Sequence, residues 1–293
     1  MRPLKIIVLA KQVPDTRNVG TDAMKPDGTV NRGKLPTIFN PDDLHALEVA
    51  LKIKDRVAGT TVTVLTMGPP KAADVIREGY FRGADNGIMI SDRRFGGADT
   101  LATSYTLVQG IKKIADYDLI IGGRQAIDGD TAQVGPQSAD KLNIPQVTYV
   151  EEILDIQDDK ITAKRRLDNG VETVVAPYPC LMTVHGSSPD CRTRQAKLVM
   201  KYKYARTATE LGSKKELDYI KQINEERDYL TIPEWSVEDI NAELEHIGLA
   251  GSPTKVKKVE SIVFTAAETK VLSDSDADIE SMIVELIDNH TIG

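Results

Sequence analysis

The sequence predicts an α/β fold in which a parallel sheet carries helices on both faces and is extended by a β-hairpin and a C-terminal arm. Short, continuously apolar runs alternate with helical patterns through the first 150 residues, as in parallel sheets buried on both faces. The pattern changes to hairpin-like alternation at about residue 151. The last 30 residues combine helical periodicity with seven acidic side chains and one basic one. We therefore expect an α/β domain over residues 1–233 and an arm over residues 234–293.

The composition excludes several classes of protein. With 293 residues and 41% hydrophobic side chains, the chain can bury a sizeable core. A formal net charge of −7 disfavours general nucleic-acid binding, which depends on phosphate neutralisation. The two cysteines form no Cys-x-x-Cys pair, and no apolar run reaches the ~20 residues of a membrane helix. We expect a cytoplasmic protein with reduced thiols and no membrane insertion.

Five strands and four helices are expected in the first half. The strands are the apolar runs Lys5–Ala10, Thr61–Met67, Gly87–Ile90, Asp118–Ile121 and Gln146–Val150. The first helix begins at Asn40, a capping residue followed by Pro41 and two acids, and the others are Pro70–Arg82, Asp99–Ile114 and Thr131–Leu142. Doubly covered parallel sheets bind ligands beyond the carboxyl ends of their strands, where the strand order reverses. The loops after the first, second and fourth strands are therefore the candidate site.

The second half is less regular. Ile161–Leu167 and Val171–Val175 flank an Asp-Asn-Gly turn and predict the hairpin. Apolar and polar residues alternate over Leu198–Tyr204, which indicates a half-exposed strand. The terminal helix is expected to be amphipathic, with five apolar residues on one face: Ile279, Met282, Ile283, Leu286 and Ile287.

The loop after the fourth strand is the densest candidate, with the sequence GRQAIDGDTAQVGP (residues 123–136). Its glycines allow close approach to the backbone, and the unpaired amides of the next helix, with the Thr131 hydroxyl, suit a phosphate. Asp128 and Asp130 fit either ribose binding or helix capping. The loop Lys11–Arg17, the long polar stretch that follows it, and Gly68 lie at the same edge of the expected sheet. Together these loops predict a nucleotide site.

No catalytic machinery accompanies this site in the sequence. The chain lacks a GxGxxG motif, a phosphate-loop lysine, an HExxH motif and a nucleophile elbow, and its four histidines lack metal-ligand spacing. A nucleotide site without a general base or nucleophile indicates a carrier, in which the cofactor supplies the reaction.

Five motifs resemble the β subunit of electron-transferring flavoprotein: KQVPDT (11–16), NPDDLHALE (40–48), MGP (67–69), the 123–136 segment and GSPTKV (251–256). The resemblance implies a Rossmann-like fold, pairing with an α subunit, and a cradle that holds FAD or AMP. The cofactor contacts that it implies are Leu9, Asn40, Pro41, Asp42, Asp43, Met67, Gly123, Arg124, Gln125, Ala126, Ile127, Asp128, Gly129, Asp130, Thr131, Ala132, Gln133, Val134 and Gly135.

The segments VPDT (13–16) and GSPT (251–254), together with Gly129, resemble the electron-bifurcating branch of that family. Membership of this branch implies FAD as cofactor and NAD(H) as electron donor. It also implies a dehydrogenase or reductase of the acyl-CoA type as partner and a low-potential acceptor such as ferredoxin. The segments Gln12–Arg17 and Gly28–Gly33, which includes Arg32, are expected near the nicotinamide nucleotide. Residues 191–197, near which relatives dock an acyl-CoA dehydrogenase, depart from the usual pattern.

Two alternative functions remain open. One is a non-bifurcating β subunit with structural AMP, and the other is a stand-alone adenine-nucleotide sensor. The arm is expected to wrap the α subunit, whereas the alternative is that its helix folds back on the chain's own sheet.

Overall fold

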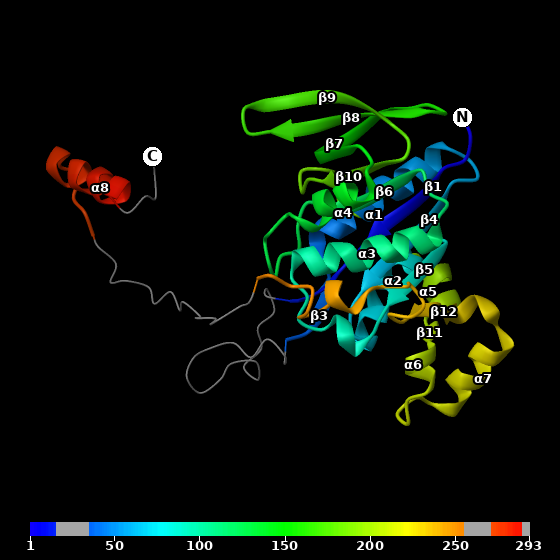
Figure 1. Ribbon diagram of the computed structural model, residues 1–293. Coiled ribbons are helices and arrows are strands. Elements are labelled where there is room, and N and C mark those ends of the chain that lie inside the picture. The colour runs from blue at the N-terminus through cyan, green and yellow to red at the C-terminus, as the bar shows by residue number, and fades with distance from the viewer. Residues whose placement is uncertain (16–34, 255–270, 289–293) are drawn as a thin grey trace.

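A nine-stranded sheet forms the centre of the chain in a computed structural model, which describes residues 1–15, 35–254 and 271–288 (Figure 1). Its strands are β1 (Lys5–Leu9), β4 (Thr61–Met67), β5 (Asn86–Ile90), β6 (Leu119–Gly123), β7 (Gln146–Ile156), β8 (Lys160–Leu167), β9 (Gly170–Pro177), β10 (Cys180–Val184) and β13 (Glu234–Trp235). They lie in the order β13-β5-β4-β1-β6-β10-β7-β8-β9, parallel from β13 to β7 and antiparallel from β7 to β9. The predicted parallel sheet and hairpin are confirmed.

Helices cover both faces of this sheet. The helices of the described chain are α1 (Pro41–Arg56), α2 (Ala73–Arg82), α3 (Thr100–Ile114), α4 (Val134–Leu142), α5 (Ala196–Tyr202), α6 (Ala208–Leu211), α7 (Asp218–Glu226) and α8 (Asp276–Asp288), with 3-10 turns η3 (Pro70–Ala72), η4 (Arg93–Phe95), η5 (Asp228–Leu230) and η6 (Leu244–His246). The helices α1 and α2 pack on the face to which Ile6 and Val8 point, and α3 and α4 pack on the face of Ile7. Because successive strand residues point to opposite faces, a doubly covered strand must be apolar throughout.

Two short strand pairs complete the fold. β2 (Gln12–Pro14) pairs with β3 (Thr37–Phe39), and β11 (Arg206–Thr207) pairs with β12 (Thr231–Ile232). The pairing of β2 with β3 brings the end of the long polar stretch back beside the loop that follows β1. None of the described helices is both long enough and apolar enough to cross a membrane.

The strand order reverses beside β1. From β1 the chain crosses to β4 and β5 on one side, and it then returns to β6 on the other side. Leu9 and Gly122 are paired at the carboxyl ends of β1 and β6. The connections that follow these two strands run in opposite directions, and a crevice forms between them.

A strand and a helix of the second half differ from the prediction. Cys180–Val184 forms the buried strand β10 between β6 and β7, which was not predicted although the run is apolar except for Thr183. Leu198–Tyr204 was expected to be a strand, but most of it lies in α5. Tyr202 stacks on Tyr80 of α2 with ring centroids 4.7 Å apart. This contact, with the i, i+4 spacing of Leu198 and Tyr202, favours a helix over the alternating pattern.

The body of the protein extends beyond residue 233, where the arm was expected to begin. β13 joins the sheet beside β5, and Val237, Ile240 and Ile247 are buried in the core on the α3 face. These side chains pack against the sheet, so residues 234–247 belong to the body. In contrast, α8 has no buried residue and lies away from the sheet (Figure 1).

Candidate functional site

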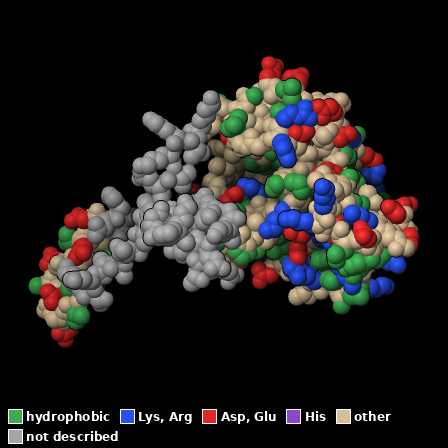
Figure 2. All heavy atoms as spheres, turned by 90° about the horizontal axis from the view of Figure 1, so that it is seen from below, with side chains coloured by type: hydrophobic (Ala, Val, Ile, Leu, Met, Phe, Trp, Pro, Cys, Tyr) green, Lys and Arg blue, Asp and Glu red, His purple; other side chains and the backbone are tan. Residues whose placement is uncertain are grey.

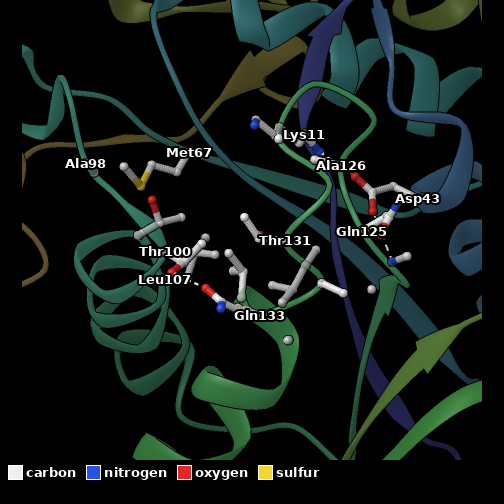
Figure 3. Close-up of a pocket in the computed structure, with 18 of the residues that line it drawn as sticks. Lys11, Asp43, Met67, Ala98, Thr100, Leu107, Gln125, Ala126, Thr131 and Gln133 are labelled. Atoms are coloured by element: carbon white, nitrogen blue, oxygen red, sulfur yellow. Dashed lines mark hydrogen bonds between the residues drawn. The ribbon is translucent and has the colours of Figure 1, made fainter. Parts of the chain in front are cut away.

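A cavity of about 400 Å³ opens at the crevice between β1 and β6 (Figure 3). This volume falls in the range of small-molecule sites, roughly 300–1,000 Å³. Apolar side chains line one part of the cavity, among them Leu9, Met67 and Leu107. The other part is bordered by the loop that connects β6 to α4, which we call the cradle loop (residues 123–135).

Most of the predicted contact residues line this cavity. They are Leu9, Asp43, Met67, Gly123, Arg124, Gln125, Ala126, Gly129, Thr131, Ala132, Gln133, Val134 and Gly135. The remaining six do not line it: Asn40, Pro41, Asp42, Ile127, Asp128 and Asp130.

The cavity also has lining residues that were not predicted as contacts: Ala10, Lys11, Leu65, Phe95, Gly97, Ala98, Asp99, Thr100, Thr103, Leu107 and Gly122. The segment 95–100 follows β5 and so lies at the same carboxyl edge of the sheet. Applying the strand-edge rule to the third strand as well would have identified it.

The backbone of the cradle loop forms a nest of N–H groups. The helix expected from Thr131 begins at Val134 instead, because Ala132 has a left-handed φ of 53° that a helix does not accommodate. Asp130 is also left-handed, whereas Gln133 is right-handed, and such alternation turns successive N–H groups toward one side. The N–H groups of residues 131–135 donate to no group in the described part of the chain. This arrangement suits a phosphate.

The first turn of α1 fixes the cradle loop to the end of β1. Asn40 does not cap α1 with its side chain; its amide donates to the Gln125 carbonyl (2.8 Å), and its oxygen accepts from the Ile127 N–H (3.1 Å). Asp43 accepts from the backbone N–H groups of Lys11 (2.9 Å) and Gly123 (3.0 Å). Residues 40–43 therefore begin α1 and also connect the cradle loop to the loop that follows β1.

The two acidic side chains of the cradle loop each accept a side-chain hydrogen bond. Lys11 Nζ donates to Asp128 (2.7 Å), and the Gln125 amide donates to Asp130 (2.8 Å). Neither acid caps α4, because that helix begins at Val134. The residues that line the cavity include no serine, histidine or cysteine.

A potential metal-binding group lies elsewhere in the described chain. It consists of Glu243, Glu245 and His246, which are exposed and do not line the cavity. The segment 28–33, with Arg32, and Arg17 were expected near a nicotinamide, and they lie outside the described residues.

Asp43 should make the stability of the protein depend on pH. Burial raises the pKa of its carboxyl to about 7, against the opposing effect of the Lys11 and Gly123 N–H groups. A raised native pKa means that the folded state binds the proton more tightly than the unfolded chain. The contribution to the free energy of unfolding is therefore greatest below about pH 4 and is lost as pH rises to 7, by roughly 1 kcal/mol per pH unit.

Asp43→Asn removes this titration. We would measure urea unfolding at pH 5, 6, 7 and 8. The free energy of unfolding of the wild type minus that of the variant should fall as pH rises to 7 and then level off. Parallel pH profiles for the two proteins would contradict the assignment.

The sequence matches known proteins over most of its length. Residues 27–208 match the family described as "Electron transfer flavoprotein domain". The chain is 45% identical to the caffeyl-CoA reductase-Etf complex subunit CarD of Acetobacterium woodii, over 86% of each chain. It is 41% identical to the electron transfer flavoprotein subunit beta of Clostridium acetobutylicum, over 87% of each chain. It is also 41% identical to the acryloyl-CoA reductase electron transfer subunit gamma of Anaerotignum propionicum, over 99% of this chain and 100% of that one.

Proposed function

The chain belongs to the electron transfer flavoprotein family, and from this premise we propose that it is a β subunit that binds FAD in the cavity between β1 and β6. The nest of N–H groups beside an apolar cavity carries the proposal. The N–H groups of residues 131–135 would hold a phosphate, and Leu9, Met67 and Leu107 would contact a ring. A Cβ at Gly129 would meet nothing within 4 Å, so the cradle loop is open at that point.

The chemistry of the proposed reaction belongs to the cofactor. Bound FAD exchanges electrons in pairs or singly, which no side chain around the cavity does. The protein's own groups position it: Asp43 and Asn40 hold the cradle loop, and the Lys11–Asp128 ion pair joins that loop to the end of β1.

We extend the proposal to electron bifurcation with NADH as the donor. It is supported by the similarity to a subunit whose name places it in a caffeyl-CoA reductase–Etf complex. The proposed acceptors are a dehydrogenase or reductase of the acyl-CoA type, reached through the FAD of the α subunit, and a low-potential acceptor such as ferredoxin. The reaction is placed in the cytoplasm, where Cys180 and Cys191 would stay reduced; both are free thiols in the structure.

The α subunit is the proposed partner of the C-terminal helix. Ile279, Met282, Ile283 and Ile287 on one face of α8 are each 38–50% exposed. Figure 2 shows hydrophobic and acidic side chains together on the surface of this helix. A contiguous exposed stripe of this kind is typical of a protein–protein contact.

The face of the body that Figure 2 shows has basic and acidic side chains interspersed, so this face has no broad basic surface for nucleic acid.

The absorbance spectrum of the purified complex distinguishes the candidate functions. We expect two flavins per heterodimer, and anaerobic mixing with NADH should bleach the flavin absorbance in a stopped-flow experiment. Thr131→Val combined with Asp128→Ala should lower the flavin content. The first substitution removes a hydroxyl group from the cavity lining, and the second removes the hydrogen bond between the cradle loop and Lys11.

Other spectra would contradict the proposal. One flavin together with AMP would establish the non-bifurcating β subunit, and a colourless protein would favour the nucleotide sensor. Two flavins that NADH leaves unbleached would keep the FAD site but exclude NADH as the donor.

A further inference from the structure

One wall of the cavity is held by a segment 150 residues away in the sequence. The wall consists of the connection from β5 to α3, and Gly97, Ala98, Asp99 and Thr100 line the cavity there. The segment that holds it runs from Gly248 to Thr254, one residue after η6 ends, and we call it the strap (residues 248–254).

The strap bonds both the backbone and the side chain of Asp99. Ser252 is buried, with 4% of its surface exposed; its hydroxyl accepts from the Asp99 N–H (2.9 Å) and donates to the Gly248 carbonyl (2.6 Å). The Thr254 N–H donates to Asp99 Oδ2 (3.1 Å). Asp99 Oδ1 meanwhile caps α3 by accepting from the N–H groups of Leu101 (2.9 Å) and Ala102 (3.0 Å). Asp99 thus joins the strap to the first turn of α3.

Backbone interlocking reinforces these bonds. The Leu249 side chain occupies the place where a Cβ on Gly97 would be, only 2.6 Å from that position. A Cβ on Gly248 would lie 2.1 Å from the Arg94 carbonyl oxygen. Gly97 and Gly248 also have left-handed φ values of 76° and 52°. The Leu249 side chain therefore packs directly on Gly97, and the backbone of Gly248 packs on that of Arg94.

The wall in turn contacts the cradle loop across the cavity. The Thr100 hydroxyl donates to the Gln133 side-chain oxygen (2.7 Å), which links the first residue of α3 to the residue before α4 (Figure 3). A continuous path of hydrogen bonds and chain neighbours therefore leads from Ser252 through Asp99 and Thr100 to the nest that suits a phosphate.

We propose that Ser252 is a positioning residue of the nucleotide site: through Asp99 it sets the wall of the cavity and its contact with the cradle loop. The inference rests on the proposed function in that it takes the cavity to bind an adenine nucleotide. It adds that the strap, which lines no part of the cavity, determines how tightly the nucleotide is held.

Ser252→Ala tests the proposal in the full-length chain. The change leaves the part-buried Asp99 N–H without its acceptor, and we expect FAD and AMP each to bind about tenfold more weakly in calorimetric titrations. Ser236→Ala is the matched control. Ser236 lies in the same C-terminal region and makes equivalent bonds, accepting from the Asp239 N–H and donating to its carboxylate, but it does not line the cavity or touch the strap. It should leave both affinities unchanged even if it lowers thermal stability as much as Ser252→Ala does.

A second variant covers the case in which Ser252→Ala does not fold. Leu249 is 67% exposed, so Leu249→Ala should fold, while the loss of its contact with Gly97 should weaken nucleotide binding two- to threefold. Unchanged affinities in the folded variants, with wild type binding normally, would overturn the proposal. If wild type itself binds neither FAD nor AMP, the nucleotide site is wrong, which is a failure of the proposed function.

Discussion

Gly123→Ala should leave the protein almost without flavin. A Cβ at this position would lie 2.5 Å from the backbone carbon of Asp42 and 2.6 Å from the backbone nitrogen of Asp43. Backbone atoms cannot rotate away, so the end of β6 would have to separate from α1. That separation would break the hydrogen bond from the Gly123 N–H to the Asp43 carboxylate. This hydrogen bond aligns the cradle loop with β1. Overpacking of this kind costs about 1–3 kcal/mol, and here the strain falls on the site itself.

The flavin-to-protein ratio after gel filtration and the urea unfolding midpoint measure this effect. Gly129→Ala is the comparison for stability, because it lies in the same loop and its added Cβ would meet nothing within 4 Å. Gly129→Ala should unfold at the wild-type urea concentration, and Gly123→Ala at a lower one. Equal midpoints for the two variants, or full flavin content in Gly123→Ala, would show that the junction of β6 with α1 does not set the site.

Deletion of residues 255–293 should abolish co-purification with the α subunit and leave the body folded. The deletion starts after Thr254 because the body needs the preceding residues: Ile240 and Ile247 are buried in its core, and Ser252 holds Asp99. What is lost includes α8, whose apolar stripe the described chain leaves exposed. If the truncated chain still forms a stable heterodimer, the main contact lies on the α/β body.

A pair of adjacent substitutions tests the stripe itself. Ile283 and Val284 are similarly exposed, at 43% and 51%, but they point about 100° apart around the helix, and only Ile283 lies on the stripe. Burying an isoleucine side chain contributes about 1.5–3 kcal/mol. Ile283→Ser should therefore weaken association with the α subunit at least tenfold in surface plasmon resonance, and Val284→Ser should change it little. Equal losses would mean that the helix does not dock by this face.

The location of the site followed from local patterns. Apolar runs such as Lys5–Ala10 and Thr61–Met67 identified buried parallel strands, and the strand-edge rule then selected the loops that border the cavity. The details of those loops did not follow. Asn40 looked like a helix cap, yet its side chain bonds the cradle loop, because Gln125 and Ile127 of another segment offer it partners at hydrogen-bond distance. Sequence alone does not show which acceptor or donor a side chain will meet.

The sequence alone was enough to predict the class of fold, most strands and helices of the first half, the hairpin and the edge of the sheet where the cavity lies. These depend on the spacing of apolar residues and on turn-forming residues, which are properties of short stretches of chain. Four features became visible only in the folded chain: the insertion of β10 between β6 and β7, the helix α5, the left-handed residues before α4, and the hydrogen bond from Asp99 to Ser252. Each of these depends on contacts between segments distant in sequence, and the packing of the whole chain determines which segments meet.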